Sequence, residues 1–265
     1  MTKLPPLIPQ QRFKNRFFSQ QTGKKVVFFF LTTLLILPEE AFAMHIMEGF
    51  LPVEWASFWT LVVIPFLIYG YRSIKQITDE TPKLKLLLAL AGAFVFALSA
   101  LKLPSLAGSS SHPTGIALGA ILFGPGPMAI IGTIALLFQA LLLGHGGLTT
   151  LGANVFSMAV AGPFIAFAIY FVTRKAGFST LLAVFLAAAL ADLSTYIVTA
   201  FQLAMAFPAE SGGILFSFTK FLSVFAITQI PLAIMDGLIT ATVFHYLKSY
   251  RGDDIAHLKL HSKEV

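Results

Sequence analysis

His45, His112 and His145 are the side chains whose type and setting best suit metal binding, because each lies between apolar runs in a stretch that contains Gly, Ser or Pro. The chain has 6 His and no Cys, so imidazole, amine, carboxylate and backbone atoms are its only candidate ligands. Imidazole nitrogen suits Ni²⁺, Co²⁺, Cu²⁺ and Zn²⁺, whereas Mg²⁺ and Ca²⁺ prefer oxygen. The remaining histidines lie at or beyond the end of the last apolar run.

His45 would belong to a chelate if Met44 were the first residue of the mature chain. The free amine of the first residue, the deprotonated amide nitrogen of the second and the ring of a second-position histidine close two chelate rings around one ion. A second imidazole, for which His112 is the first candidate, would complete a plane of four nitrogens. Such a plane suits Ni²⁺, Cu²⁺ or low-spin Co²⁺. A histidine also falls second by chance, so these residues alone leave the metal site a hypothesis.

Four other polar residues have weaker claims to a role at this site. His145 is flanked by glycines, which suit a tight turn as well as a group that supports the ligands or lines the path of the ion. Glu48 lies close to the proposed mature N-terminus and would hold that segment in place. Asp192 and Asp236 lie within apolar runs, where hydrogen bonding between helices is favoured over ion handling.

The first part of the chain has the pattern of a secretory signal peptide. Residues 1–25 are polar and basic, residues 26–37 are apolar, and Ala-Phe-Ala occupies 41–43. The apolar run is shorter than the roughly 20 residues that a spanning helix needs. The sequence therefore predicts cleavage of residues 1–43, which would expose the amine of Met44 on the outer face of the membrane.

Composition places the rest of the chain in a membrane as an all-α protein. Hydrophobic residues make up 57% of the chain and charged residues 11%, whereas a soluble domain carries about a quarter charged residues. About seven transmembrane helices are predicted, one of them short or broken and packed inside the protein, and a six-span version stays open. The apolar runs are 53–71, 85–103, 115–123, 127–144, 153–173, 178–206 and 221–247.

The distribution of Lys and Arg predicts the orientation. With the mature N-terminus outside, seven crossings put most basic residues and the C-terminus in the cytoplasm, as the positive-inside rule requires. The predicted parts are a metal-binding segment at 44–52, a helical bundle at 53–250 and a cytoplasmic tail at 251–265. The basic residues predicted to be cytoplasmic are Arg72, Lys75, Lys83, Lys85, Arg174, Lys175, Lys248 and Arg251.

Several motifs in order resemble the CbiM and NikM family, the substrate-capture membrane subunits of energy-coupling-factor cobalt and nickel transporters, and CbiM most closely. The resemblance covers essentially all of 44–247. Asp236 is a departure, since a glutamate is expected there, but the carboxylate is kept. The motifs are Met44-His45-Ile46-Met47-Glu48-Gly49-Phe50-Leu51-Pro52, Ser111-His112-Pro113-Thr114-Gly115, Phe123-Gly124-Pro125, the stretch from Gly144 to Asn154, and Thr228-Gln229-Ile230-Pro231-Leu232-Ala233.

The resemblance implies a helical bundle in the inner membrane that captures Co²⁺, or Ni²⁺ in the nickel-type equivalent, for uptake and cobalamin biosynthesis. It implies that Met44, His45 and His112 hold the ion, with His145, Glu48 and Asn154 as candidates to support them. It also implies partners, namely a CbiQ-type transmembrane coupling subunit, CbiO-type cytoplasmic ATPases and a small CbiN-type accessory membrane subunit. The chain has no nucleotide-binding loop of its own, so no enzyme activity and no catalytic cofactor are expected.

Two functions of other classes compete with capture of a metal ion. An intramembrane metal-dependent hydrolase would also need histidines at membrane depth, but no His-Glu-x-x-His pattern occurs in the chain. A passive channel or a structural membrane protein would give no meaning to Met44 and His45. If the protein were a channel or a structural protein, replacement of His45 would leave metal uptake unchanged.

Overall fold

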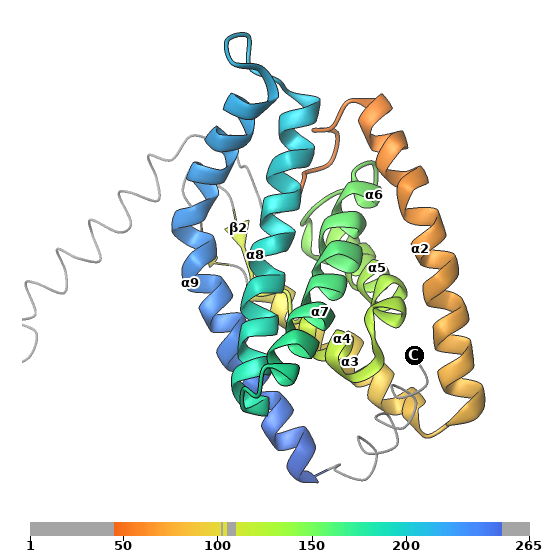
Figure 1. Cartoon of the computed structure of the whole chain (residues 1–265). Helices are drawn as coiled ribbons and strands as arrows, with labels where there is room; N and C mark the ends of the chain where they lie inside the picture. The colour runs from red at the N-terminus through yellow and green to blue at the C-terminus, as the bar shows by residue number, and fades with distance from the viewer. Residues whose placement is uncertain (1–44, 102, 105–109, 251–265) are drawn as a thin grey trace, which may run out of the picture. The chain divides into compact units, whose positions relative to one another are not determined.

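The computed structural model of the protein describes residues 45–101, 103–104 and 110–250. Met44 and the predicted signal peptide and C-terminal tail lie outside these residues. The described residues are almost entirely helical, as the composition predicted (Figure 1). The elements are α2 (Val53–Glu80), α3 (Leu84–Ala100), β1 (Leu103–Pro104), β2 (Ser110–Ser111), α4 (Ile116–Phe123), α5 (Pro125–Leu143), α6 (Leu151–Asn154), the π-helical η2 (Val155–Ala161), α7 (Gly162–Lys175), α8 (Thr180–Ala206) and α9 (Gly213–Tyr250).

Within the described ranges, five helical segments are long and apolar enough to cross a membrane. They are Val53–Glu80, Pro125–Leu143, Leu151–Lys175, Thr180–Ala206 and Gly213–Tyr250. Because an α-helix rises about 1.5 Å per residue, each is close to or longer than the ~30 Å hydrocarbon layer. The shorter α3 is also apolar, so the number of crossings remains a prediction.

α4 is the short helix that the sequence predicted inside the protein. It has 8 residues, about 12 Å of helix, and seven of its side chains are buried. Gly115 (φ 63°) and Gly124 (φ 84°) bound it in backbone conformations that suit glycine. The helix packs against α5, α7 and α8, and this position puts the loop that precedes it in the interior.

The segment from α6 to α7 is one continuous helix with a π-helical insert. The insert spans Val155–Ala161 and begins directly after Asn154. Pro163 has no backbone N–H to continue the regular ladder, and the wider turns precede it. π-helical turns often occur next to functional sites, and here the insert follows the residue that holds the N-terminal segment.

α8 and α9 share the most extensive helix–helix contact among the described residues. Gly237 of α9 lies so near α8 that an added Cβ would come within 2.7 Å of the Phe185 ring and 2.9 Å of the Phe185 carbonyl oxygen. On α8, Ala187 and Ala188 are fully buried. Small residues at such contacts let helix backbones approach in a membrane. α9 begins at Gly213, earlier than the predicted apolar run at 221–247. The run was placed too late because the exposed Thr219 and Lys220 interrupt the apolar pattern but not the helix.

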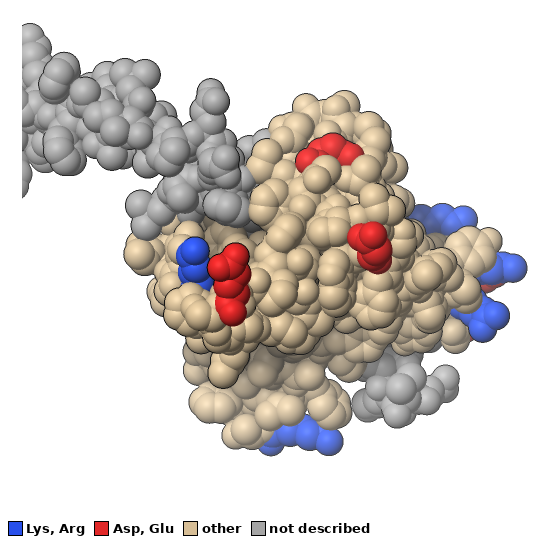
Figure 2. Space-filling view, turned by 90° about the horizontal axis from the view of Figure 1, so that it is seen from above, with Lys and Arg blue, Asp and Glu red and all other residues tan. Residues whose placement is uncertain are grey.

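Basic residues gather at one end of the bundle, where α2 and α9 end and α3 begins (Figure 1). The exposed cations there include Arg72, Lys83 and Lys248. Seen from the opposite end, acidic side chains lie apart from one another on the face, and Lys and Arg side chains also show at its rim (Figure 2). The exposed charged residues near the helix ends on that side include Glu48, Glu54, Glu210 and Lys220.

Candidate metal centre

Three imidazole rings from distant parts of the chain meet inside the described part of the protein. His45 lies in the segment before α2, His112 between β2 and α4, and His145 directly after α5. The ring centroids are 5.0 Å apart for His45 and His112, 4.9 Å for His45 and His145, and 5.0 Å for His112 and His145. All three side chains are buried, with relative exposures of 0%, 0% and 3%.

The spacing of these rings suits one metal ion. One ligand nitrogen from each residue lies within 4.8 Å of the others. Two nitrogens on opposite sides of an ion at ordinary bond lengths would be roughly 4 Å apart. The three imidazoles would therefore need to move only slightly toward one another to bind one ion. Buried imidazoles are neutral when they bind a metal, because a proton and a metal ion compete for the same lone pair.

His145 lies as close to His45 as His112 does. The sequence favoured His112 as a ligand and gave His145 a supporting role, because the glycines around His145 also suit a turn. Those glycines do form a turn, with Gly144 at φ 55° and Gly146 at φ 76°. The turn directs His145 inward, so the distances give His112 and His145 equal standing in the cluster.

Asn154 and Thr150 hold the segment that carries His45. The Ile46 N–H donates to Asn154 Oδ1 (2.8 Å), and Asn154 Nδ2 donates back to the Ile46 carbonyl (3.0 Å). The Thr150 hydroxyl donates to the same carbonyl (2.7 Å). Asn154 is therefore a supporting residue that touches the backbone next to His45. Thr150 has the same role, and the sequence gave no sign of it because its partner is a backbone atom more than 100 residues away.

Glu48 lies at the exposed edge of this segment rather than in the imidazole cluster. The backbone N–H of Thr149 donates to both carboxylate oxygens, at 3.1 and 3.3 Å. Hydrogen bonding to the Thr149 side chain, and then to its backbone N–H, lowers the pKa of Glu48. Gly147 permits this contact, since a Cβ there would lie 2.5 Å from the Glu48 Cα. Glu48 thus links the N-terminal segment to the turn before α6.

His112 is oriented by its own loop. Its Nδ1 lies 2.9 Å from the Pro113 carbonyl oxygen. A carbonyl oxygen only accepts hydrogen bonds, so Nδ1 must carry the proton and Nε2 keeps the lone pair for an ion. This second contact of the ring is the arrangement that commonly orients metal-binding histidines.

The two membrane-depth carboxylates differ in their surroundings. Asp236 is fully buried and accepts hydrogen bonds from the loop after His112 and from Thr240. Asp192 is also fully buried, and neither of its oxygens has a hydrogen-bond partner among the described residues. The sequence preferred a structural role for both residues, and the contacts of Asp236 agree with it.

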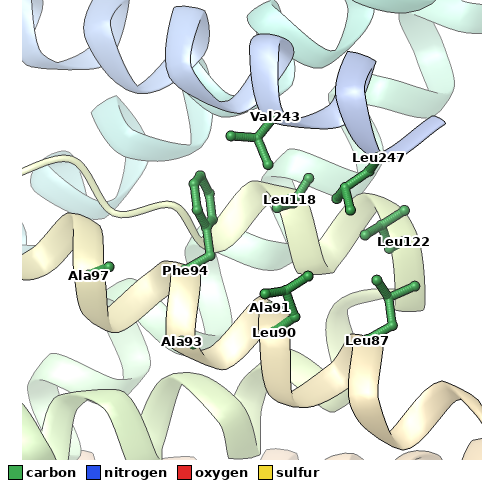
Figure 3. Close-up of a pocket in the computed structure, with 10 residues that line it drawn as sticks. All are labelled: Leu87, Leu90, Ala91, Ala93, Phe94, Ala97, Leu118, Leu122, Val243 and Leu247. Carbon is green, nitrogen blue, oxygen red and sulfur yellow. The ribbon is translucent and has the colours of Figure 1, made fainter. Parts of the chain in front are cut away.

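The cavity in Figure 3 is separate from the imidazole cluster. Its volume is about 290 Å³, and its walls are apolar side chains of α3, α4 and the C-terminal part of α9. Figure 3 shows Phe94, Leu118 and Val243 among the side chains that point into it. A cavity without polar groups offers no ligand to a metal ion.

Taken together, long apolar helices and a buried three-imidazole cluster define a membrane protein with a set of nitrogen donors that could hold a metal ion. The chain belongs to the CbiM family, whose family model, described as the cobalt uptake substrate-specific transmembrane region, matches residues 45–253.

Relatives named cobalt transport protein CbiM match most of the chain. The one from a Nostoc species is 62% identical over 220 residues, which are 83% of this chain and 84% of that protein. The one from Moorella thermoacetica is 59% identical over 224 residues, which are 84% of this chain and 86% of that protein. These relatives are named as transport proteins and not as enzymes.

Solved structures share the fold. One described as a transition metal transporter superposes with a TM-score of 0.69 at 25% identity, over 80% of this chain and 96% of that one. A second, described as a truncated transition metal transporter, gives 0.68 at 26% identity, over 78% and 99%.

Proposed function

We propose that this protein is the cobalt-capturing membrane subunit of an energy-coupling-factor uptake system, with its metal centre opening to the outer face. The observation that carries the proposal is the convergence of His45, His112 and His145 within 4.8 Å in a chain that belongs to the CbiM family. The relatives named as cobalt transport proteins support cobalt as the cargo.

We assign the ligands to the Met44 amine, the His45 backbone and ring nitrogens and the His112 ring. His145 is a further nitrogen ligand in this proposal, because its ring is as near to His45 as that of His112. Cleavage after residue 43 would generate the Met44 amine. The family match that begins at residue 45 supports a mature chain that starts close to this position.

The orientation follows from the charges at the two ends of the bundle. The end rich in exposed Lys and Arg is assigned to the cytoplasm by the positive-inside rule. The described residues of the opposite end carry three exposed carboxylates, Glu48, Glu54 and Glu210, against one exposed lysine, Lys220. A carboxylate excess of this kind attracts divalent cations to the outer face.

Transport itself would need partners. A CbiQ-type coupling subunit, CbiO-type ATPases and a CbiN-type accessory subunit are proposed, and the cobalt they import would supply cobalamin biosynthesis. Nickel is the competing cargo, because the same nitrogen set accepts both ions and intrinsic affinity rises from Co²⁺ to Ni²⁺. An uptake assay in cells with both ions present separates the two, since a cobalt system must take up Co²⁺ in preference to Ni²⁺.

The ligand set is tested by mass spectrometry of the N-terminus of the purified protein, with metal content measured on the same sample. The expected result is a chain that starts at Met44 and carries about one Co²⁺ per molecule. An intact residue 1 in protein that binds metal would remove the amine from the ligand set. Absence of metal binding by a chain that starts at Met44 would overturn the proposed capture of an ion.

A further inference from the structure

The imidazole cluster is assembled from two separately anchored parts of the chain. His45 and His145 belong to one part, because the segment of His45 is bonded to Asn154, Thr150 and Thr149 in the stretch that follows His145. None of these hydrogen bonds reaches the loop of His112. The third imidazole must therefore be held in place by something else.

α9 holds the loop of His112. The backbone N–H groups of Thr114 and Gly115 donate to Asp236 Oδ2 at 3.0 and 3.1 Å, and the Thr114 hydroxyl donates to the same oxygen at 2.8 Å. Two turns earlier on α9, Gln229 Nε2 donates to the Ser111 hydroxyl at 2.9 Å. The residues on both sides of His112 are thus bonded to one helix.

From these contacts we infer that Asp236 is the positioning residue for His112, so that α9 sets the geometry of the metal centre. The inference rests on the proposed function, since it assumes that His112 binds the transported ion.

The contact between Asp236 and the loop is buried, which raises the free-energy cost of breaking it. Asp236 and Thr114 are both fully buried, so an N–H of the loop that lost its acceptor would have no water to replace it. Asp192, the neighbouring buried carboxylate, also lies near the Thr114 backbone, but the well-formed hydrogen bonds of Thr114 and Gly115 go to Asp236, at 3.0 and 3.1 Å. The loop therefore depends chiefly on Asp236.

The test compares two replacements of Asp236 in the full-length protein, purified in detergent, with Co²⁺ as the probe. Asp236→Leu keeps the branched shape and the number of heavy atoms, although it is larger, and it offers no acceptor, so the loop should shift and the affinity for Co²⁺ should fall by about 10–100-fold, as is typical when a group that orients a metal ligand is lost. Its ligand-field absorption spectrum should resemble that of His112→Ala. Asp236→Asn keeps an oxygen acceptor for the loop and should stay within about threefold of the unaltered protein.

The Asn variant separates positioning from charge. If Asp236 served as a negative counter-charge for the ion, Asp236→Asn would lose as much affinity as Asp236→Leu, and the inference would be wrong. A native spectrum and affinity in Asp236→Leu would also overturn it. Thr242→Val, which removes an exposed hydroxyl that bonds within α9, is the matched control and should bind Co²⁺ normally.

A second variant covers the case in which Asp236→Leu does not fold. Thr114→Val removes only the hydroxyl bond to Asp236 and should give a smaller change in the same direction; an unchanged spectrum and affinity would count against the inference. Failure of the proposed function looks different, because the unaltered protein and Asp236→Asn would then bind no Co²⁺ at all.

Discussion

At the scale of single residues, the proposed metal centre depends on three imidazoles that the fold keeps out of water. Their burial explains why neutral imidazole, and not a carboxylate, suits this position, since an isolated buried carboxylate would cost more free energy than a buried neutral ring. Asn154 makes two hydrogen bonds to the backbone beside His45, and these fix the segment that carries the first proposed ligand.

His145→Ala tests whether the third imidazole touches the ion. We expect the affinity for Co²⁺ to fall by at least about tenfold, comparable with His112→Ala, because each variant removes one nitrogen from the cluster. Isothermal titration calorimetry of the purified variants gives the dissociation constants. His245→Ala is the control, since His245 is exposed near the end of α9, and an unchanged affinity in His145→Ala would return His145 to a supporting role.

Metal binding should weaken as the pH falls from about 8, because protons compete first for the Met44 amine, with an ordinary pKa of about 8, and then for the imidazoles, with an ordinary pKa of about 6.5. Glu48 should not contribute to this dependence. Its pKa is lowered in the folded protein, so its carboxylate stays ionised from pH 8 to 5 and its contacts are lost only in stronger acid.

The measurement is Co²⁺ affinity as a function of pH for the unaltered protein and for Glu48→Gln. The two profiles should have the same midpoint and slope between pH 5 and 8. A midpoint that moved with Glu48→Gln would show that this carboxylate titrates with the metal centre.

At the scale of elements, close approach between α2 and α6 positions the stretch that holds the N-terminal segment. Gly152 lies against α2, where an added Cβ would come within 2.6 Å of the backbone N and Cα of Thr60. Asn154 is the last residue of α6, so the spacing of α2 and α6 also sets the position of the side chain that bonds to the Ile46 backbone.

Gly152→Ala should therefore destabilise the protein and weaken Co²⁺ binding together. Overpacking against a backbone costs about 1–3 kcal/mol, which would lower the midpoint of thermal unfolding in detergent. Gly92→Ala is the matched control, since its Cβ would meet a single flexible side-chain atom of Ile131 at 3.2 Å. Equal melting temperatures for the two variants would contradict the proposed role of the α2–α6 contact.

At the scale of the whole molecule, the proposed chelate links capture of the ion to processing of the chain. One extra residue placed before Met44 in the mature protein should abolish high-affinity binding, because the amine would leave its position next to the His45 backbone nitrogen. The thermal unfolding midpoint of the metal-free protein should stay the same. Normal Co²⁺ affinity in the extended protein would mean that the three imidazoles suffice without the amine.

The sequence by itself determined the membrane class, the helical fold and the short inner helix, because apolar run length and glycine or proline boundaries are local properties of the chain. Its motifs predicted His45 and His112 as ligands, and the structure places their rings 5.0 Å apart. The start of α9 was placed too late, since exposed Thr219 and Lys220 interrupt the apolar pattern while the helix continues.

Only the tertiary structure decided which groups meet. His145 joins the cluster because the turn after α5 lies against the N-terminal segment, and Asp236 reaches Thr114 across more than 100 residues of sequence. Thr150 and Asn154 act on backbone atoms of Ile46, and a backbone partner leaves no trace in residue type or spacing. Contacts of this kind follow from how helices pack in space, and no local pattern along the chain encodes them.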